Sequence, residues 1–311
     1  MRRIVAAPLA LLLLASQACS SAPQAAVIAA DGALCDITQR LAANDLRVTC
    51  LLEGDADPHQ LQLSPDQTRQ LRQAQLVLIN GYGLTPALES LPTAVKVAEE
   101  AVPDSPALSG NDPHNHHDGH GHGDRDPHVW HDPRQAEAMV TLVSQQLQKL
   151  APTRSSQILA RAQAMQNDLQ ALHRWNRRQF ATLPQPRVLA SGHRAFASLA
   201  RAYDLEELAL LDATSSSATL RPQVLTAVVD QLKRRRVSSL FAEQLPPPRT
   251  LERISSISGV PLAPRPLRAD SAGTNLMATL TDNTCLIVNS LGGRCDASGA
   301  AKLMQQWTAI R

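Results

Sequence analysis

Histidine is the residue whose placement in this chain most clearly indicates chemistry. Seven of the ten histidines lie between Ser109 and Pro133. They are His114, His116, His117, His120, His122, His128 and His131. The first five stand among Gly, Asn and Asp without apolar periodicity, which is typical of a solvated loop. Because neutral imidazole is the commonest nitrogen ligand for zinc, copper and nickel, the loop of residues 109–124 indicates binding of a divalent transition metal. The alternative is a low-complexity loop that binds nothing.

Four residues stand beyond predicted strands, where a metal site can be assembled. They are His59 in the sequence DPH, His128 in DPHVWHDP, His193 in SGH and Asp270 in RADS. In open α/β sheets, ligands bind in the crevice beyond the carboxyl ends of the strands. Three imidazoles and one carboxylate would close a tetrahedral zinc site. We therefore expect these four side chains to meet in one place.

Each candidate also has a structural alternative. His193 follows Gly192, and this tight turn would serve equally to begin the next helix. Asp270 would equally cap the helix predicted to follow it. His173, in the middle of a predicted helix, is interpreted as a packing or surface residue rather than a ligand. The placement that the four candidates share at strand ends favours the metal site.

Short apolar runs alternate with helical patterns almost throughout the chain. The predicted strands are residues 26–30, 48–52, 76–80, 95–98, 187–190, 239–242 and 261–263. The predicted helices are residues 37–43, 66–73, 134–150, 153–183, 195–202, 222–235, 251–258, 274–291 and 300–310. Ser64 and Pro65 supply the cap and first-turn proline of the second helix. This alternation predicts an α/β protein with parallel sheets flanked by helices.

One predicted helix is much longer than a single lobe requires. The segment after Pro152 contains neither Gly nor Pro for some 30 residues, and would span roughly 45 Å at 1.5 Å per residue. We interpret it as a connection between two lobes. The expected organisation is a signal peptide and tether (1–24), an N-terminal α/β lobe (25–151), a connecting helix (152–183) and a C-terminal α/β lobe (184–311).

Composition narrows the class of partner. The chain has 311 residues, a hydrophobic content of 43%, an aromatic content of 3% and a formal net charge of +2. A chain of this length can form two domains, each with its own core. Because no basic face dominates, nucleic acid is excluded as a partner.

The N-terminus predicts export. Arg2 and Arg3 precede an apolar run (residues 4–14) that is too short to span a membrane, and a small-x-small cleavage site ends at Ala18. Cys19 follows directly. This arrangement resembles a bacterial lipoprotein signal, in which the cysteine is lipidated, and free secretion is the alternative. No later segment is long and apolar enough to span a membrane, so a lipid anchor would be the only membrane attachment.

Four cysteines remain in the exported part: Cys35, Cys50, Cys285 and Cys295. An even number in an exported chain predicts disulfides rather than free thiols. Three pairings are possible. Proximity in the sequence favours Cys35–Cys50 and Cys285–Cys295, but the sequence alone does not choose between them.

Several ordered motifs resemble one family, the zinc/manganese group of metal-specific substrate-binding proteins of bacterial ABC importers. The matching motifs are DPH (57–59) with PD (65–66), DPHVW (126–130) with DP (132–133), SGHRAF (191–196) and DS (270–271). The resemblance covers residue 26 to the C-terminus. It implies two Rossmann-like lobes joined by one long rigid helix, with the metal in the cleft between them.

By residue, the resemblance implies His59, His128 and His193 as ligands, with Asp270 or a water molecule as the fourth. The chain is similar to zinc members of the family in having histidine as the third ligand, His193, and in having a histidine-rich loop. Manganese members usually carry glutamate at that ligand position. His131 departs from the family, which has an apolar residue after Trp130. It is therefore considered as an alternative ligand or as a route from the loop to the site.

The expected function is capture of Zn²⁺ outside the cytoplasm and its delivery to an ABC importer, formed by a membrane permease and a cytoplasmic ATPase. We expect a monomer in the periplasm or on the outer face of the cytoplasmic membrane. Manganese is the less favoured metal. The alternatives are a periplasmic zinc buffer without a transporter and an exported zinc hydrolase. A hydrolase is disfavoured because the sequence has no HExxH motif and no glutamate beside the predicted ligands as an obvious general base.

Overall fold

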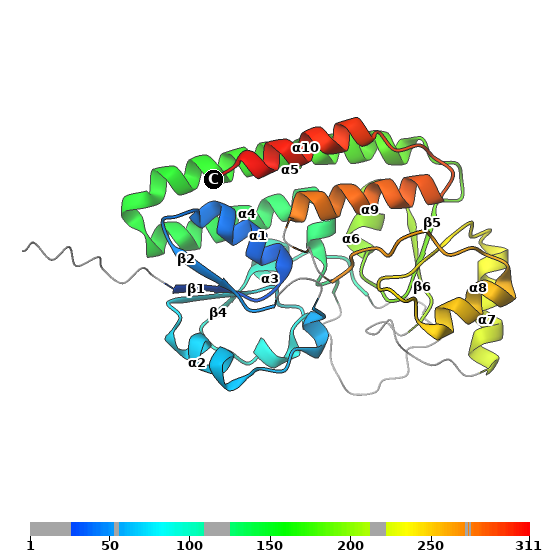
Figure 1. Cartoon of the computed structure of the whole chain (residues 1–311), viewed down its shortest axis with the longest axis horizontal. Helices are drawn as coiled ribbons and strands as arrows, with labels where there is room; N and C mark the ends of the chain where they lie inside the picture. The colour runs from blue at the N-terminus through cyan, green and yellow to red at the C-terminus, as the bar shows by residue number, and fades with distance from the viewer. Residues whose placement is uncertain (1–25, 53–55, 109–124, 212–221, 271–272, 274) are drawn as a thin grey trace, which may run out of the picture.

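The chain folds into two α/β lobes, each built on its own parallel sheet (Figure 1). The computed structural model describes residues 26–52, 56–108, 125–211, 222–270, 273 and 275–311. The N-terminal sheet has the order β2-β1-β3-β4, and the C-terminal sheet has the order β6-β5-β7. The strands are β1 (Ala26–Ala29), β2 (Arg47–Cys50), β3 (Leu76–Ile79), β4 (Ala94–Lys96), β5 (Val188–Ser191), β6 (Glu206–Ala209) and β7 (Leu240–Phe241). Every strand pairing described within these sheets is parallel, which confirms the predicted α/β class.

Helices cover both sheets. The α-helices are α1 (Gly32–Ala42), α2 (Pro65–Gln73), α3 (Val97–Ala101), α4 (Pro133–Leu150), α5 (Ser155–Ala181), α6 (Ala197–Tyr203), α7 (Pro222–Arg234), α8 (Arg249–Ser258), α9 (Leu276–Ser290) and α10 (Ala297–Ala309). The 3₁₀ turns are η1 (Pro58–Gln60), η2 (Pro86–Leu88), η3 (Val129–His131) and η4 (Pro152–Arg154). At the start of α2, Ser64 and Gln67 form a reciprocal capping box. The cap predicted from Ser64 and Pro65 is therefore present.

Helix α5 joins the two lobes, as predicted. Its 27 residues span about 40 Å at 1.5 Å per residue. Six of its buried residues, among them Met165, Leu169 and Trp175, belong to the core of the N-terminal lobe. Phe180, near the other end, belongs to the core of the C-terminal lobe. Figure 1 shows α5 running the length of the molecule above both sheets.

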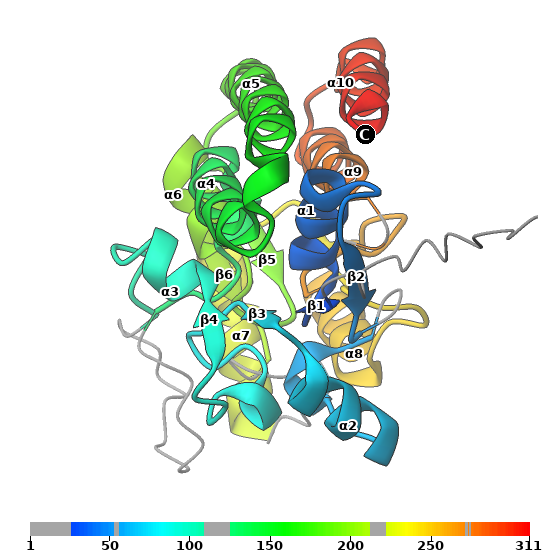
Figure 2. The same ribbon diagram turned by 90° about the vertical axis from the view of Figure 1, so that its left-hand side faces the viewer.

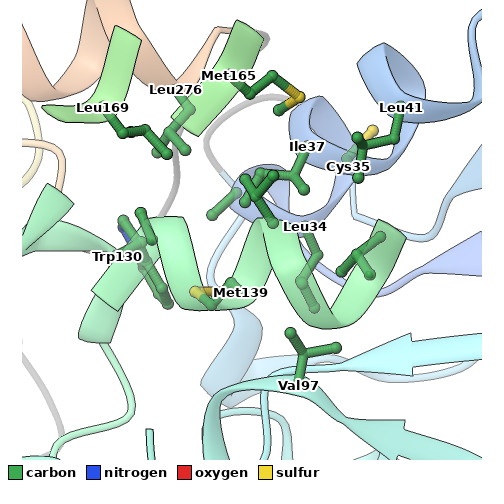
Figure 3. Close-up of a cluster of buried hydrophobic side chains, with 14 of the residues drawn as sticks. Leu34, Cys35, Ile37, Leu41, Val97, Trp130, Met139, Met165, Leu169 and Leu276 are labelled. Carbon is green, nitrogen blue, oxygen red and sulfur yellow. The ribbon is translucent and has the colours of Figure 1, made fainter. Parts of the chain in front are cut away.

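Helix α9 also contributes to both cores. Leu276 and Leu280 lie in the N-terminal core, whereas Ile287 and Val288 lie in the C-terminal core. Figure 3 shows Leu276 pointing toward the side chains of α1, α4 and α5. Helices α5, α9 and α10 pack against one another on one side of the molecule (Figures 1 and 2). The lobe boundaries predicted at residues 151 and 183 stay predictions.

Two strand predictions differ from the structure, and one strand was not predicted. The strand predicted at 95–98 ends at Lys96, because Ala98 and Glu99 both donate backbone N–H groups to the carbonyl of Asn80 as α3 begins. The strand predicted at 261–263 is reduced to a single bridge between Leu240 and Leu262. The proline at 261 has no N–H for a ladder. Strand β6 was not predicted, because its sequence EELA has no β-branched or aromatic residue.

Both disulfides join the cysteine pairs that sequence proximity favours. Cys35 of α1 is bonded to Cys50 of β2, and Cys285 of α9 is bonded to Cys295, with Cα–Cα distances of 5.5 and 5.1 Å. Two other predictions lie outside the described residues. These are the leader with Cys19 and the five leading histidines of the 109–124 loop. Across the described parts of the chain, no helix is long and apolar enough to cross a membrane.

Candidate metal centre

The four residues predicted from the ends of strands lie together between the lobes. One ligand atom from each of His59, His128, His193 and Asp270 lies within 4.8 Å of every other. The Asp270 Oδ1 atom is central: it lies 3.2 Å from His59 Nε2, 2.9 Å from His128 Nε2 and 3.0 Å from His193 Nε2. The side chains of His128 and His193 are buried, while those of His59 and Asp270 are 10% and 21% exposed. These four residues could hold a metal ion.

The N-terminal lobe contributes His59 and His128. His59 lies in η1, where the Asp57 carboxylate caps the turn by accepting the backbone N–H of His59 at 2.9 Å. His128 immediately precedes η3, and its backbone N–H is held in the same way by Asp126 at 2.8 Å. In both DPH motifs the aspartate two residues before the histidine therefore fixes the turn that presents the imidazole.

The C-terminal lobe contributes His193 and Asp270. His193 follows β5 by two residues, at the carboxyl edge of its sheet. Gly192 beside it approaches the Glu243 carboxylate so closely that an added Cβ would lie 3.0 Å from an oxygen. Asp270 lies in the segment between the Leu262 bridge and α9. Both positions agree with the rule that ligand sites form beyond the carboxyl ends of parallel strands.

Buried carboxylates orient two of the three imidazoles. Asp126 Oδ1 lies 3.1 Å from His128 Nδ1, and Glu243 Oε2 lies 2.6 Å from His193 Nδ1. A carboxylate accepts, so each Nδ1 carries a proton, and Nε2, which faces Asp270, is the nitrogen that would give up its proton to bind a metal. Partners of this kind fix the tautomer and raise the basicity of a metal-binding histidine.

The charges of the cluster reinforce one another. Burial opposes protonation of His128, but its hydrogen bonds to Asp126 and Asp270 outweigh burial and raise its pKa to about 9. The pKa of His193 is likewise raised well above its usual value against the effect of burial, by the charges of Glu243 and Asp270. Burial would raise the pKa of Asp270, but the His193 charge and three imidazole hydrogen bonds hold it well below its usual value. A cation that binds at this centre would therefore displace protons from the imidazoles.

His131 lies outside the four-residue cluster. Its Nε2 atom lies 2.9 Å from the carbonyl oxygen of Ala269, and its ring is buried. Burial lowers the pKa of His131 to about 4, so the ring is neutral. His173 is partly buried and lies 3.1 Å from the hydroxyl of Tyr203, in agreement with a packing role. The structure thus separates these two histidines from the candidate ligands.

One glutamate lies beside a candidate ligand in the structure, although the sequence places none near it. Glu243 contacts His193, yet the two are 50 residues apart in sequence. Its other oxygen accepts the backbone N–H groups of Gly192 and His193 at 2.9 and 3.2 Å. The missed signal was its position two residues beyond β7, at the same edge of the sheet as His193. Glu243 faces the ring nitrogen that points away from the cluster, so it serves as an orienting group.

Comparisons with known proteins match the chain to metal-binding proteins. A family model described as zinc-uptake complex component A, periplasmic, matches residues 27–290. The metal-binding protein YtgA of Chlamydia pneumoniae is 27% identical over 280 residues, covering 83% of both chains. The zinc-binding protein TroA of Treponema pallidum is 29% identical over 235 residues, covering 73% of this chain and 72% of TroA. The manganese-binding lipoprotein MntA of Bacillus subtilis is 28% identical over 227 residues, covering 72% of each.

One of these relatives also has a solved structure with a similar fold. The solved structure of the periplasmic zinc-binding protein TroA from Treponema pallidum superposes with a TM-score of 0.75 and 25% sequence identity. The match covers 87% of this chain and all of TroA. The likeness therefore extends over both lobes and the helices that join them.

Proposed function

The chain belongs to the family of periplasmic component A proteins of zinc-uptake complexes, and on this premise we propose that it captures Zn²⁺ and delivers it to an ABC importer. The family consists of metal-binding components of uptake systems. Zinc is the cargo, so binding has to be tight and also reversible. The observation that carries the proposal is the convergence of three imidazole nitrogens on one carboxylate oxygen within 3.2 Å.

We propose His59, His128, His193 and Asp270 as the zinc ligands. Tetrahedral zinc bound at about 2.0–2.1 Å would separate its donor atoms by about 3.3 Å. The nitrogen–oxygen distances of 2.9 to 3.2 Å are close to that value. The other separations between the four ligand atoms, all within 4.8 Å, would adjust toward that value as the ion enters. Asp270 supplies the fourth donor in this proposal, in place of the water molecule considered as the alternative.

The donor set supports zinc over manganese. Imidazole suits zinc, whereas manganese favours sites rich in carboxylate, carbonyl and water oxygens. Here three of the four donors are nitrogens, and the nearby carboxylates of Asp126 and Glu243 contact histidine rings instead of the cluster's centre. TroA is named a zinc-binding protein and MntA a manganese-binding one, so the relatives alone favour neither metal. The chemistry of the four donors carries the assignment.

A zinc hydrolase is a weaker reading of the same cluster. Catalytic zinc keeps an open position for water, whereas four protein donors close the tetrahedron. The nearest glutamate, Glu243, is already occupied by His193 Nδ1 and two backbone N–H groups. It has no free oxygen directed at the cluster, so it is poorly placed as a general base. Peptidase and esterase assays on the zinc-loaded protein test this alternative directly.

We propose that the protein acts as a monomer outside the cytoplasm, either secreted freely or anchored through a lipidated Cys19. Its partners are a membrane permease, the cytoplasmic ATPase of that permease and the metal itself. The five loop histidines, His114, His116, His117, His120 and His122, would bind additional zinc weakly. A periplasmic zinc buffer without a transporter remains the second candidate, because it would use the same site.

Competition titration against a zinc chelator tests the ligand assignment. Wild type is expected to bind one zinc ion tightly. Replacement of His59, His128 or His193 by Ala should weaken binding by more than the roughly 10–100-fold that loss of an orienting partner costs. His173→Ala is the matched control, since this histidine bonds to Tyr203 away from the cluster. Wild-type affinity in the His193→Ala variant would overturn a site shared by both lobes.

Delivery requires a separate measurement. Radioactive zinc and manganese are each supplied to vesicles that carry the cognate permease. Uptake of zinc should depend on the added protein. Manganese delivery without zinc delivery would overturn the metal assignment. Tight zinc binding with no delivery of either metal would favour the buffer.

A further inference from the structure

The segment that carries Asp270 is held by both lobes. On one side, Asn283 of α9 accepts the backbone N–H of Arg268 at 3.0 Å and donates to the carbonyl of the same residue at 2.8 Å. On the other side, the next carbonyl, that of Ala269, faces His131 Nε2 at 2.9 Å. His131 lies in η3 of the N-terminal lobe, three residues after His128. A hydrogen bond between the lobes therefore ends beside Asp270.

His131 is fixed in the orientation that this bond requires. Its ring centroid lies 4.8 Å from that of Phe196 and 5.5 Å from that of Trp130, and all three side chains are buried. A carbonyl oxygen only accepts hydrogen bonds, so the contact places the ring proton of His131 on Nε2. His131 is also not among the residues whose ligand atoms lie within 4.8 Å of one another. His131 is held in place for a task other than metal coordination.

We propose that His131 is the positioning residue of Asp270, a role that rests on the proposed zinc function. The carbonyl oxygen of Ala269 and the backbone nitrogen of Asp270 belong to one planar peptide group. Holding that oxygen sets the orientation of the peptide from which the Asp270 side chain departs. His131 thereby keeps Asp270 in register with His59 and His128, which come from its own lobe.

This role explains why the bond crosses between lobes. Leu267, in the C-terminal core, donates its backbone N–H to the carbonyl of Ala242 at 2.8 Å, and this contact alone would let Asp270 move with that lobe. The His131 bond adds a restraint from the N-terminal lobe within one residue of the ligand. Loss of the restraint should lower affinity through Asp270 and leave the three imidazoles in place.

A double-mutant cycle tests the proposal. His131→Leu removes the N–H donor and keeps apolar volume, while His131→Gln retains an N–H donor of similar reach. We expect His131→Leu to weaken zinc binding about 10–100-fold, the range typical of lost orienting partners. His131→Gln should recover most of that loss. In an Asp270→Ala background, His131→Leu should have no further effect, because the residue that it positions is absent. His173→Leu is the control for removal of a histidine elsewhere.

The readouts are zinc affinity by chelator competition and the visible absorption of the cobalt-substituted protein, which reports the coordination of the metal. A loss from His131→Leu that persists in the Asp270→Ala background would overturn the proposal and favour direct ligation by His131. Unchanged affinity in His131→Leu, with tight binding in wild type, would overturn the positioning role alone. Absence of a tight site in wild type would overturn the proposed function itself. If His131→Leu does not fold, His131→Met provides a second variant without the donor.

Discussion

The carboxylate of Asp126 in the N-terminal lobe accepts two hydrogen bonds from Ser198 in the C-terminal lobe. The Oδ2 atom of Asp126 lies 2.9 Å from the backbone nitrogen of Ser198 and 2.6 Å from its hydroxyl oxygen. The Oδ1 atom of the same carboxylate faces His128 Nδ1 at 3.1 Å. Both residues are buried. One side chain therefore orients a candidate ligand and joins the lobes beside the metal centre.

Asp126→Asn should weaken zinc binding about 10–100-fold, the usual cost of losing an orienting partner of a metal-bound histidine. An amide has one acceptor atom, so it cannot serve both His128 and the two Ser198 donors. Ser198→Ala, which removes one donor only, should have a smaller effect. Chelator competition measures both, with Asp66→Asn on the exposed face of α2 as control. Equal affinities in Asp126→Asn and wild type would contradict the orienting role.

Zinc binding should release protons at neutral pH. The pKa of His128, about 9, means that this imidazole is largely protonated at pH 7.5 in the metal-free protein, and the charges of Glu243 and Asp270 shift the pKa of His193 in the same direction. Zinc binds the neutral imidazole, so it displaces these protons, and affinity should rise with pH until about pH 9. Calorimetric titration in buffers of different ionisation enthalpy should give roughly one to two protons released per zinc. Zero protons, or an affinity flat from pH 7.5 to 5.5, would contradict this electrostatic account.

Asp36 should be essential for stability but not for binding. This buried carboxylate of α1 accepts from the backbone N–H of Leu276 at 3.0 Å and from Trp307 Nε1 at 2.7 Å, and pairs with Arg40 at 2.9 Å. Asp36→Ala leaves the buried donors without this acceptor, which should cost about 3–5 kcal/mol of unfolding free energy. Urea unfolding of the metal-free protein measures the loss. Asp66→Ala, which breaks an exposed pair with Arg69, should cost at most about 1 kcal/mol. Similar costs for the two variants would contradict the buried network.

Deletion of residues 111–123 should leave one tight zinc equivalent. All four proposed ligands lie outside this segment. Holding its Gly-, Asn- and Asp-rich sequence in one geometry costs about 1–2 kcal/mol per backbone residue, so zinc bound there should be weaker. Calorimetric titration should show that the weak equivalents disappear and that the tight affinity changes little. Loss of the tight equivalent would mean that the loop supplies a primary ligand.

The sequence alone predicted the features that depend on neighbouring residues. The pattern of apolar runs predicted both parallel sheets, and the absence of Gly and Pro predicted the length of α5. Motifs after predicted strands identified His59, His128, His193 and Asp270, which the structure brings within 4.8 Å of one another. Each of these signals depends on residues a few positions apart, through backbone propensity, capping or the end of a strand. It can therefore be recognised from the sequence alone.

Only the tertiary structure decided which groups surround those residues. Asp270 lies 211 residues from His59, and Glu243 lies 50 residues from His193, yet both pairs are in hydrogen-bond contact. His131 was a candidate ligand by sequence, but the docking of the lobes directs its ring to the carbonyl of Ala269. Local propensity sets the direction of a turn, whereas the partner that a side chain reaches depends on how two separately built lobes pack. Contacts across that interface determine the chemistry of each histidine.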